Sequence, residues 1–454
     1  MALRSLAPAQ PRHRRRAPVF CCSAQLARVA VLGAGPGGLA LALALRQLPA
    51  PPHVTVFDAE SEATLRAARG AALNINGGAS VLHDLGLGRE VAAIANPLRR
   101  LVARTVGGWE LMDVNIEAAI KSAGPAAAAG LFREGACTAV TVLRADLQRL
   151  LLDAALAAGA ELRCEERVSG VEAAGPGAVT LATTAGPLPE QYDLVVGADG
   201  LRSAARRLLS GPDSAPQYSD IRIAFGVTDR ADAAAEALRP APMEAHQWFA
   251  PGAYALAYSA GQGFGAAGAH GAHCLALCWR AEGAVGENAG WVASAEARAA
   301  AVGRLSALAF PEEVAALARS ATRFFELGVH HHDPLPAGGW VGGPGGLVVL
   351  LGDSAHAMPP FLGQGANQAI QDAAALATRL GGLGSTYATL PEALRAYEDA
   401  RRGPTAALQL ASRGVGLLET APPPFSSLRD VALRFAGLTG AAGLVFASGA
   451  TPRL

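Results

Sequence analysis

The sequence predicts an α/β protein in which a parallel-sheet domain is interleaved with a second domain built on a mainly antiparallel β-sheet, followed by C-terminal helices. Three features lead to this prediction. Residues 28–58 read as strand, glycine turn, helix and strand; residues 217–334 hold short strands between glycine turns; apolar residues recur at helical spacing after residue 402. The length of 454 residues suggests two or three domains.

The composition excludes several classes of protein. Lys121 is the single lysine, so the chain has no GKS or GKT phosphate-binding loop and only one residue that could form a Schiff base. Six cysteines without paired spacing argue against a disulfide scaffold or a cysteine-rich zinc site, and no metal site is expected. The 38 basic and 38 acidic residues give no electrostatic footprint for nucleic acid. No apolar run is long enough to predict a transmembrane helix.

Basic residues are concentrated at the N-terminus. Arginines and no acids precede Asp58, and most of these arginines lie before residue 17. Residues 1–25 therefore resemble an organelle transit peptide, with a plastid preferred to a mitochondrion as the destination. A disordered basic tail on a cytoplasmic protein is the alternative. A secretory signal fits less well because no apolar run of the required length follows the arginines.

The first structural signal is the unit from Arg28 to Asp58. A short apolar strand, Val29–Leu32, runs into a glycine turn and then into a long apolar, helix-favouring segment. The turn consists of Gly33, Ala34, Gly35, Pro36, Gly37 and Gly38. The first glycine permits the tight turn, the second lets a pyrophosphate approach the backbone, and the last lets the helix pack closely on the strand. A second strand, His53–Phe57, ends at Asp58, whose carboxylate could bind an adenosine ribose. The unit predicts a dinucleotide site without distinguishing NAD from FAD.

Two later segments distinguish these cofactors. Residues 192–203 form a buried-strand pattern that ends in Asp199, Gly200 and Arg202, and residues 346–372 read GLVVLLGDSAHAMPPFLGQGANQAIQD. Together with the first glycine turn, these segments resemble the single-component flavoprotein monooxygenases of the aromatic-hydroxylase type, which include salicylate-hydroxylase-like proteins and zeaxanthin epoxidases. The resemblance covers about residues 28–401, and the three motifs stand in the order typical of that family.

The resemblance implies a glutathione-reductase-type, Rossmann-like FAD-binding domain that is discontinuous in sequence, with FAD as cofactor and NAD(P)H as co-substrate. We assign residues 26–106, 136–216 and 335–402 to this domain, residues 107–135 and 217–334 to the substrate domain, and residues 403–454 to a C-terminal helical tail. No second GxGxxG with strand and helix flanks occurs, which suits a family in which NAD(P)H docks transiently. The choice between NADH and NADPH is open.

The resemblance also implies which residues bind FAD. Asp353 would bind the ribityl hydroxyls, the helix opening at Gly365 would point its positive end at the flavin pyrimidine edge, and Pro359 would lie against the isoalloxazine ring. The expected cofactor-binding residues are Gly33, Gly35, Pro36, Gly37, Gly38, Asp58, Arg144, Asp199, Gly200, Arg202, Gly352, Asp353, Pro359, Gly363, Gln364, Gly365, Ala366 and Asn367. The alternatives are structural: Asp353 as a helix cap, Asp199 in a strand-ending turn, and Arg144 as a charge at a helix start.

The expected reaction follows from the cofactor. Reduced flavin in a water-excluded site forms a C4a-hydroperoxide with O2, which transfers one oxygen atom to a small aromatic or apolar substrate by hydroxylation or epoxidation. No catalytic side chain is required, and His356 is a weak candidate that could equally be structural. His330–Asp333 looks like a metal site, but neighbours on an extended segment point to opposite faces. That segment is therefore expected to be a strand end with a solvated turn.

Two other functions are open. One is a same-fold flavin oxidoreductase, either a reductase or a halogenase, although the Trp-x-Trp-x-Ile segment associated with halogenases is absent. The other is a prenyl-binding escort protein without redox activity, which the intact Asp353 makes less favourable.

The remaining segments predict less. Aromatic residues of the substrate domain could line an apolar pocket or belong to ordinary core; they are Phe225, Trp248, Phe249, Tyr254 and Tyr258. In the tail, the helical spacing of Leu428, Val431, Ala432, Phe435 and Leu438 favours a helix packed on the body of the protein, with peripheral membrane docking as the alternative. The identity of the substrate and the oligomeric state are not predicted.

Overall fold

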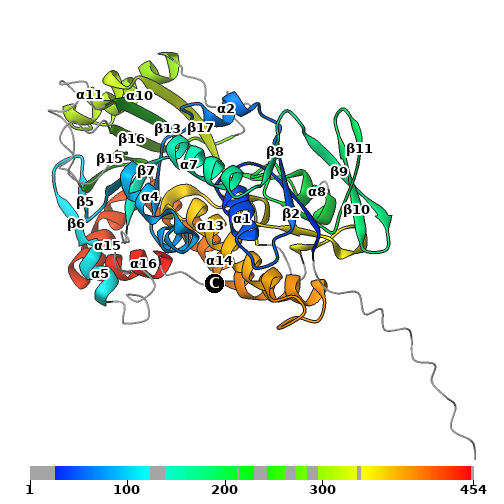
Figure 1. The fold of residues 1–454 in the computed structure, drawn as a ribbon. Coiled ribbons are helices and arrows are strands. Elements are labelled where there is room, and N and C mark those ends of the chain that lie inside the picture. The colour runs from blue at the N-terminus through cyan, green and yellow to red at the C-terminus, as the bar shows by residue number, and fades with distance from the viewer. Residues whose placement is uncertain are drawn as a thin grey trace, which may run out of the picture.

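A six-stranded sheet, parallel except for one edge strand, lies at the centre of the first domain (Figure 1). The structure is a computed structural model that describes residues 26–122, 139–211, 214–229, 243–261, 271–283, 295–334 and 339–450. In spatial order the strands are β18 (Val341–Gly342), β19 (Val348–Leu350), β12 (Leu194–Gly197), β1 (Arg28–Leu32), β2 (His53–Phe57) and β8 (Glu161–Arg163). The central strands are apolar along their length because both faces of the sheet are covered.

Helices cover one face of this sheet, and a three-stranded antiparallel sheet covers the other (Figure 1). The helical layer contains α1 (Pro36–Arg46), α7 (Arg144–Ala157) and α13 (Gly365–Gly381), with the long α14 (Leu390–Glu419) packed on α13. The smaller sheet contains β9 (Val168–Gly175), β10 (Ala178–Thr183) and β11 (Gly186–Tyr192), and α8 (Ala204–Ser210) packs beside it. This arrangement confirms the predicted glutathione-reductase-type domain.

The second domain is built on a seven-stranded sheet in which all neighbours are antiparallel except β14 and β5. In spatial order its strands are β17 (Arg323–His331), β13 (Gln217–Asp229), β16 (Ala272–Arg280), β15 (Ala253–Ala260), β14 (Glu244–Ala250), β5 (Arg100–Thr105) and β6 (Glu110–Asn115). The mainly antiparallel sheet is as predicted. It begins at Arg100, however, which lies before the boundary that the sequence suggested at residue 107.

The two faces of the seven-stranded sheet have different coverings. Helices α10 (Ala295–Ala307) and α11 (Glu312–Ser320) pack on the outer face, where Trp248 lies. The inner face turns toward the cofactor domain and carries Phe225, Phe249, Tyr254 and Tyr258. Four of the five aromatic residues proposed for a pocket therefore share one face, and Trp248 belongs to the core on the other.

A small antiparallel sheet connects the two domains, since it contacts both β15 and α13. Its strands are β3 (Ala72–Ile75), β7 (Val140–Leu143) and β4 (Ala95–Pro97). The remaining short elements are α2 (Glu62–Arg66), α3 (Gly77–Leu82), η1 (His83–Leu87), α4 (Gly88–Ile94), α5 (Ile116–Ser122), η3 (Pro344–Gly346), α12 (Asp353–His356) and η4 (Pro360–Leu362).

The C-terminal helices pack against the second domain beside β6 (Figure 1). Helix α14 runs without interruption across residue 402, where the sequence suggested a boundary, and is followed by α15 (Phe425–Thr439) and α16 (Ala441–Ala450). Helix α15 packs as predicted, but through the opposite side: the buried residues are Ser426 and Arg429, and a Cβ on Gly437 would meet the Leu111 carbonyl oxygen at 2.6 Å.

The apolar stripe that led to the prediction for α15 points outward. Its large members, Leu428, Val431, Phe435 and Leu438, are 57–70% exposed, so the expectation that these side chains pack on the body is wrong. On the inward side, Gly437 allows the close approach of α15 to β6. Within the described part of the chain, no helix has both the length and the apolar character needed to cross a bilayer.

Candidate functional site

The glycine turn after β1 closes because its glycines occupy places where no side chain fits. Gly33 has φ +105°, its N–H donates to the Phe57 carbonyl oxygen at 2.7 Å, and a Cβ there would lie 2.4 Å from the Ala198 oxygen. A Cβ on Gly38 would lie 2.1 Å from the Gly33 oxygen. A Cβ on Gly35, by contrast, would meet nothing within 4 Å. The turn is thus tightly built on one side and open at Gly35, as a site for a pyrophosphate requires.

Asp58 holds this turn from the end of β2. One carboxylate oxygen accepts a hydrogen bond from the Ala34 N–H at 2.7 Å, and the other accepts from the Glu60 N–H at 2.8 Å. A carboxylate has about four lone-pair positions, so each oxygen can still accept a bond from a ribose hydroxyl. Pro36 is the first residue of α1, where its missing N–H costs nothing and the remaining N–H groups face the turn.

A cavity of about 340 Å³ opens at the carboxyl ends of β1, β2 and β12. It brings together six of the sequence-predicted residues, which are Gly33, Gly35, Asp58, Asp199, Gly200 and Arg202. Ligands of parallel α/β sheets bind at this edge. The cavity also contains Arg167 and Arg207, which the sequence did not suggest. These two arginines add positive charge where an anionic pyrophosphate would lie.

Asp199 is a helix cap as well as a wall of the cavity. Its carboxylate accepts from the Ser203 hydroxyl and from the N–H groups of Ala204 and Ala205, at 2.6 and 3.3 Å, at the start of α8. Burial raises the pKa of Asp199, and these hydrogen bonds oppose the shift. Arg202 is exposed at the rim. Asp199 therefore fixes the shape of the cavity, while Arg202 keeps a charge available to a ligand.

The second group of predicted residues surrounds Asp353, the first residue of α12. The Asp353 side chain is open to solvent, and a Cβ on Gly365 would lie 3.8 Å from its Oδ1, so the carboxylate lies near the N-terminus of α13. The density of protein atoms around this exposed residue still raises the pKa of its carboxyl group by desolvation, while His356 and Arg144 act in the opposite direction. Arg144 interacts electrostatically with Asp58 as well as with Asp353. It therefore connects the two halves of the site.

The turn from Pro359 to Asn367 is fixed by its own hydrogen bonds. The Pro359 carbonyl oxygen accepts from the Ser412 hydroxyl at 2.6 Å, and Gly363 adopts the left-handed conformation with φ +62°. The Asn367 amide donates to the carbonyl oxygens of Asn74 and Gly363, and its oxygen accepts from the N–H groups of Asn76 and Gly78. The side chain of Asn367 is thus committed to holding the turn, and only its backbone is left for a cofactor. Gln364 is buried and Ala366 is half-buried at the same helix start.

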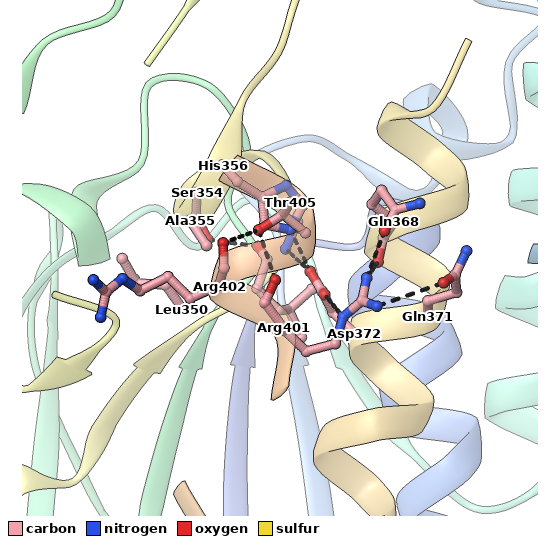
Figure 2. A network of polar contacts seen from close by, with 12 residues as sticks. Leu350, Ser354, Ala355, His356, Gln368, Gln371, Asp372, Arg401, Arg402 and Thr405 are labelled. Carbon is pink, nitrogen blue, oxygen red and sulfur yellow. Dashed lines mark hydrogen bonds and ion pairs between the residues drawn. The ribbon is translucent and has the colours of Figure 1, made fainter. Parts of the chain in front are cut away.

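Sequence reasoning missed a buried network behind the Gly352–Asp353 step (Figure 2). Asp372 on α13 bonds through Oδ2 to His356 Nε2 at 2.6 Å and to the Gly352 N–H at 2.8 Å, and through Oδ1 to Arg401 Nε at 2.7 Å. Arg401 also donates to Gln368. Burial alone would raise the pKa of Asp372, but His356 and Arg401 hold it below its usual value. A carboxylate within the apolar stripe of a predicted helix was the available signal.

His356 is fully buried in this network, with its ring 5.3 Å from that of Trp340. It is the last residue of α12, the short helix that begins at Asp353, and its hydrogen bond to Asp372 anchors that helix. The His330–Asp333 segment is likewise internal in part. His331 and His332 are buried, and His332 Nε2 bonds the Leu201 carbonyl oxygen at 2.8 Å, so the expectation of a solvated turn is wrong there. Among the described residues, no cluster of three or more His, Cys, Asp or Glu is arranged to hold a metal ion.

Comparison with known proteins identifies the family. A family model described as an FAD binding domain matches residues 27–240 and 344–410. A 3-amino-4-hydroxybenzoate 2-monooxygenase from Streptomyces cremeus is 31% identical over 398 residues, covering 85% of this chain and 86% of the relative. The chain belongs to the FAD-dependent monooxygenases. An aurachin C monooxygenase/isomerase from Stigmatella aurantiaca is 30% identical to this FAD-dependent monooxygenase over 374 residues. The alignment covers 82% of this chain and 84% of the relative.

Solved structures with the same fold support the architecture of this FAD-dependent monooxygenase. Klebsiella pneumoniae HpxO complexed with FAD and uric acid has a TM-score of 0.74 at 22% identity, covering 94% of this chain and 97% of HpxO. A salicylate hydroxylase substrate complex has a TM-score of 0.70 at 22% identity, covering 95% of this chain and all of that chain. At these identities the likeness establishes the fold alone.

The glycine turn of this FAD-dependent monooxygenase allows a matched pair of variants. In FAD-free protein, Gly38→Ala is expected to lower the free energy of unfolding by about 2 kcal/mol or more, because its Cβ collides with the Gly33 oxygen. Gly35→Ala meets no protein atom, so the unfolding free energy should change by less than about 0.5 kcal/mol. FAD affinity should nevertheless fall about tenfold, since the new methyl group projects into the site. Denaturant titration and FAD titration measure the two effects. Normal FAD binding by Gly35→Ala would show that the pyrophosphate does not approach this residue.

Proposed function

We propose that this FAD-dependent monooxygenase uses NAD(P)H and O2 to insert one oxygen atom into an aromatic or apolar small molecule. The observation that carries the proposal is the position of the largely apolar inner sheet face, which adjoins the Pro359–Gly363 turn at Tyr254 and Phe361, whose ring centroids are 6.4 Å apart. A substrate on this face would lie beside the turn expected to contact the flavin ring. The relative at 31% identity is a 3-amino-4-hydroxybenzoate 2-monooxygenase, which favours an aromatic substrate.

The residues present fit an FAD molecule. Gly35 leaves open space beside the N-terminus of α1, and Asp353 presents an exposed carboxylate in an otherwise enclosed setting. Bound FAD would supply the oxygen chemistry. The protein would hold the pyrophosphate at the α1 N-terminus, the adenosine ribose at Asp58 and the ribityl chain at Asp353. The positive end of α13 would stabilise negative charge on the flavin, and the apolar sheet face would exclude water.

The test is the activity of purified protein. The protein should be yellow, and a substrate should accelerate oxygen-dependent NAD(P)H oxidation with a product heavier by one oxygen atom. Comparison of NADH with NADPH would identify the reductant, and comparison of phenolic acids with carotenoid-like alkenes would separate hydroxylation from epoxidation. NAD(P)H oxidation without any oxygenated product would instead favour the reductase alternative. Protein that neither retains nor rebinds FAD would exclude both.

We also propose that residues 1–25 direct the protein to an organelle, with a plastid preferred. The arginine-rich, acid-free character of this segment supports the proposal, as does the start of the family match at residue 27. Residues 1–25 lie outside the described part of the structure. The mass of the mature protein isolated from its own cells should show a cleaved N-terminus; an intact N-terminus would favour a basic tail.

A further inference from the structure

The inner face of the seven-stranded sheet is not fully covered at its centre. One register row runs across it from Phe225 through Ala276 and Leu256 to Gln247. Phe225 and Leu256 remain half-buried although they lie in the middle of the sheet, and Ala276 between them is small. These two apolar side chains are therefore only partly covered by protein on the inner side of the sheet. A substrate of the proposed function would lie against them.

The row ends in a hydrogen-bonded pair, Gln247 and Glu419, that no other contact of the fold requires. Gln247 Nε2 donates to Glu419 Oε1 at 2.8 Å. Glu419 Oε2 is buried, and among the described residues no group meets the geometry of a hydrogen bond to it, although the Tyr254 hydroxyl lies close enough to stabilise the carboxylate. Tyr254 and Cys278 from the next row face the same carboxyl group. A buried carboxyl oxygen without a close partner is costly, so its presence at the end of a partly exposed apolar row indicates a ligand group.

Glu419 is also unfavourably placed as a purely structural residue. It is the last residue of α14, where the helix dipole disfavours negative charge. Arg429 is close, but its guanidinium pairs with Asp430 and bonds the backbone oxygens of Glu419 and Ala250, rather than the Glu419 carboxyl group. Asp372 is the contrast, because the same kind of buried acid is there fully paired. Groups kept in costly surroundings cluster at functional sites.

Helix α14 connects this group to the turn expected to contact the flavin. Gly416, one turn before Glu419, packs so closely on Phe361 that a Cβ would lie 2.1 Å from the ring. Residues three apart on a helix share a face, so Glu419 and the Phe361 contact lie on the same side of α14. Phe361 in turn contacts Tyr254 of the sheet. The carboxyl group, the sheet row and the Pro359–Gly363 turn therefore surround one region.

We infer that Glu419 and Gln247 form the polar end of the substrate site and accept hydrogen bonds from an amino or hydroxyl substituent on the substrate. The inference rests on the proposed oxygenase function and adds the two residues that would select the polar substituent of the substrate. The apolar row holds the ring, and Glu419 Oε2 accepts a hydrogen bond from the N–H or O–H group of the substituent. Gln247 orients the carboxyl group through its amide N–H.

The protonation of Glu419 gives the inference a pH signature. Burial raises the pKa of Glu419 to about 7, opposed by Gln247, Tyr254 and Arg429. The neighbouring Tyr254 and Cys278 stay protonated near neutral pH, because burial raises the pKa values of both side chains. Glu419 is thus protonated below about pH 7 and a stronger acceptor above it. The preference for an amino or hydroxyl ligand over its methyl counterpart should rise between pH 6 and pH 8, because the charge on the rest of the ligand is common to both.

The experiment uses the FAD-loaded full chain and benzoates carrying an amino, hydroxyl or methyl group at each ring position. Binding is measured by the change in flavin absorption. Wild-type protein should prefer at least one amino or hydroxyl ligand to its methyl counterpart by about tenfold, the effect of one hydrogen bond to a charged group. Glu419→Gln should reduce this preference to less than about threefold and abolish its pH dependence. Asp399→Asn, an exposed acid on the same helix, should behave as wild type.

Each outcome bears on the inference. Absence of a donor preference in wild type, or the same preference in Glu419→Gln, would overturn it. If Glu419→Gln loses flavin, Gln247→Leu serves as the second variant, and an unchanged preference there also overturns the inference. Failure of the proposed function would look different: the donor preference and its loss in Glu419→Gln would persist, while no ligand gained an oxygen atom.

Discussion

Replacement of Asp353 by alanine is expected to remove FAD from the protein. The wild-type carboxylate is exposed beside the N-terminus of α13 and close to Arg144 and His356, so it is placed to accept hydrogen bonds from cofactor hydroxyl groups. A hydrogen bond to a charged group contributes about 1.5–3 kcal/mol, which corresponds to about a tenfold to hundredfold loss of affinity. The purified variant should be colourless and should rebind FAD weakly in a fluorescence titration.

Two further variants serve as controls for Asp353→Ala. Asp399→Ala removes an exposed aspartate from α14 and should leave FAD affinity unchanged. Asp353→Asn keeps the size and one acceptor oxygen, so its affinity should lie between those of wild type and Asp353→Ala. If Asp353→Ala binds FAD with wild-type affinity, the assignment of this residue to the ribityl chain is wrong, and the helix-cap alternative is favoured.

Asp372→Asn is expected to have the largest effect on stability. The substitution leaves the Arg401 guanidinium buried without its carboxylate partner and weakens the hold on His356 and the Gly352 N–H. Removal of one partner from a buried ion pair costs about 3–5 kcal/mol. Denaturant unfolding of FAD-free protein should show this loss. FAD binding should weaken as well, because the Gly352–Asp353 step loses an anchor.

A substitution of Arg401 tests whether the effect of Asp372→Asn comes from this ion pair. If the destabilisation comes from the loss of the negative charge beside the buried guanidinium, Asp372→Asn combined with Arg401→Gln should cost less than the sum of the single variants. Because the network holds the pKa of Asp372 below its ordinary value of 3.8, its contribution is present above that pH and is lost as the pH falls through the lowered pKa. Additive effects of the two substitutions would contradict the coupling that the distances imply.

Local sequence patterns were sufficient for the cofactor domain. The predicted second strand has the same bounds as β2, and the glycine turn, the strand at Leu194–Gly197 and the helix opening at Gly365 all occur as expected. These features are short-range, because each depends on residues adjacent in the chain. The cavity then unites six predicted residues, since the carboxyl ends of neighbouring parallel strands meet at one edge.

Long-range pairing is where the sequence was insufficient. Strand β5 joins the seven-stranded sheet by pairing in parallel with β14, more than 100 residues away in sequence, which no local pattern indicates. The orientation of α15 failed for a related reason. The apolar stripe marks one face of the helix, but the small face of Ser426 and Gly437 fits against β6. The Asp372–Arg401 pair required knowledge that α13 and α14 lie side by side.

Helix α14 has one consequence for how the protein can vary. Its 30 residues span about 45 Å, with Arg401 behind the Gly352–Asp353 step and Glu419 at the substrate sheet. A single residue inserted between these two positions would rotate the second relative to the first by about 100° and shift it by about 1.5 Å. An insertion or deletion between Arg401 and Glu419 would therefore misplace one of the two side chains. Insertions in loops elsewhere in the tail would not have this effect.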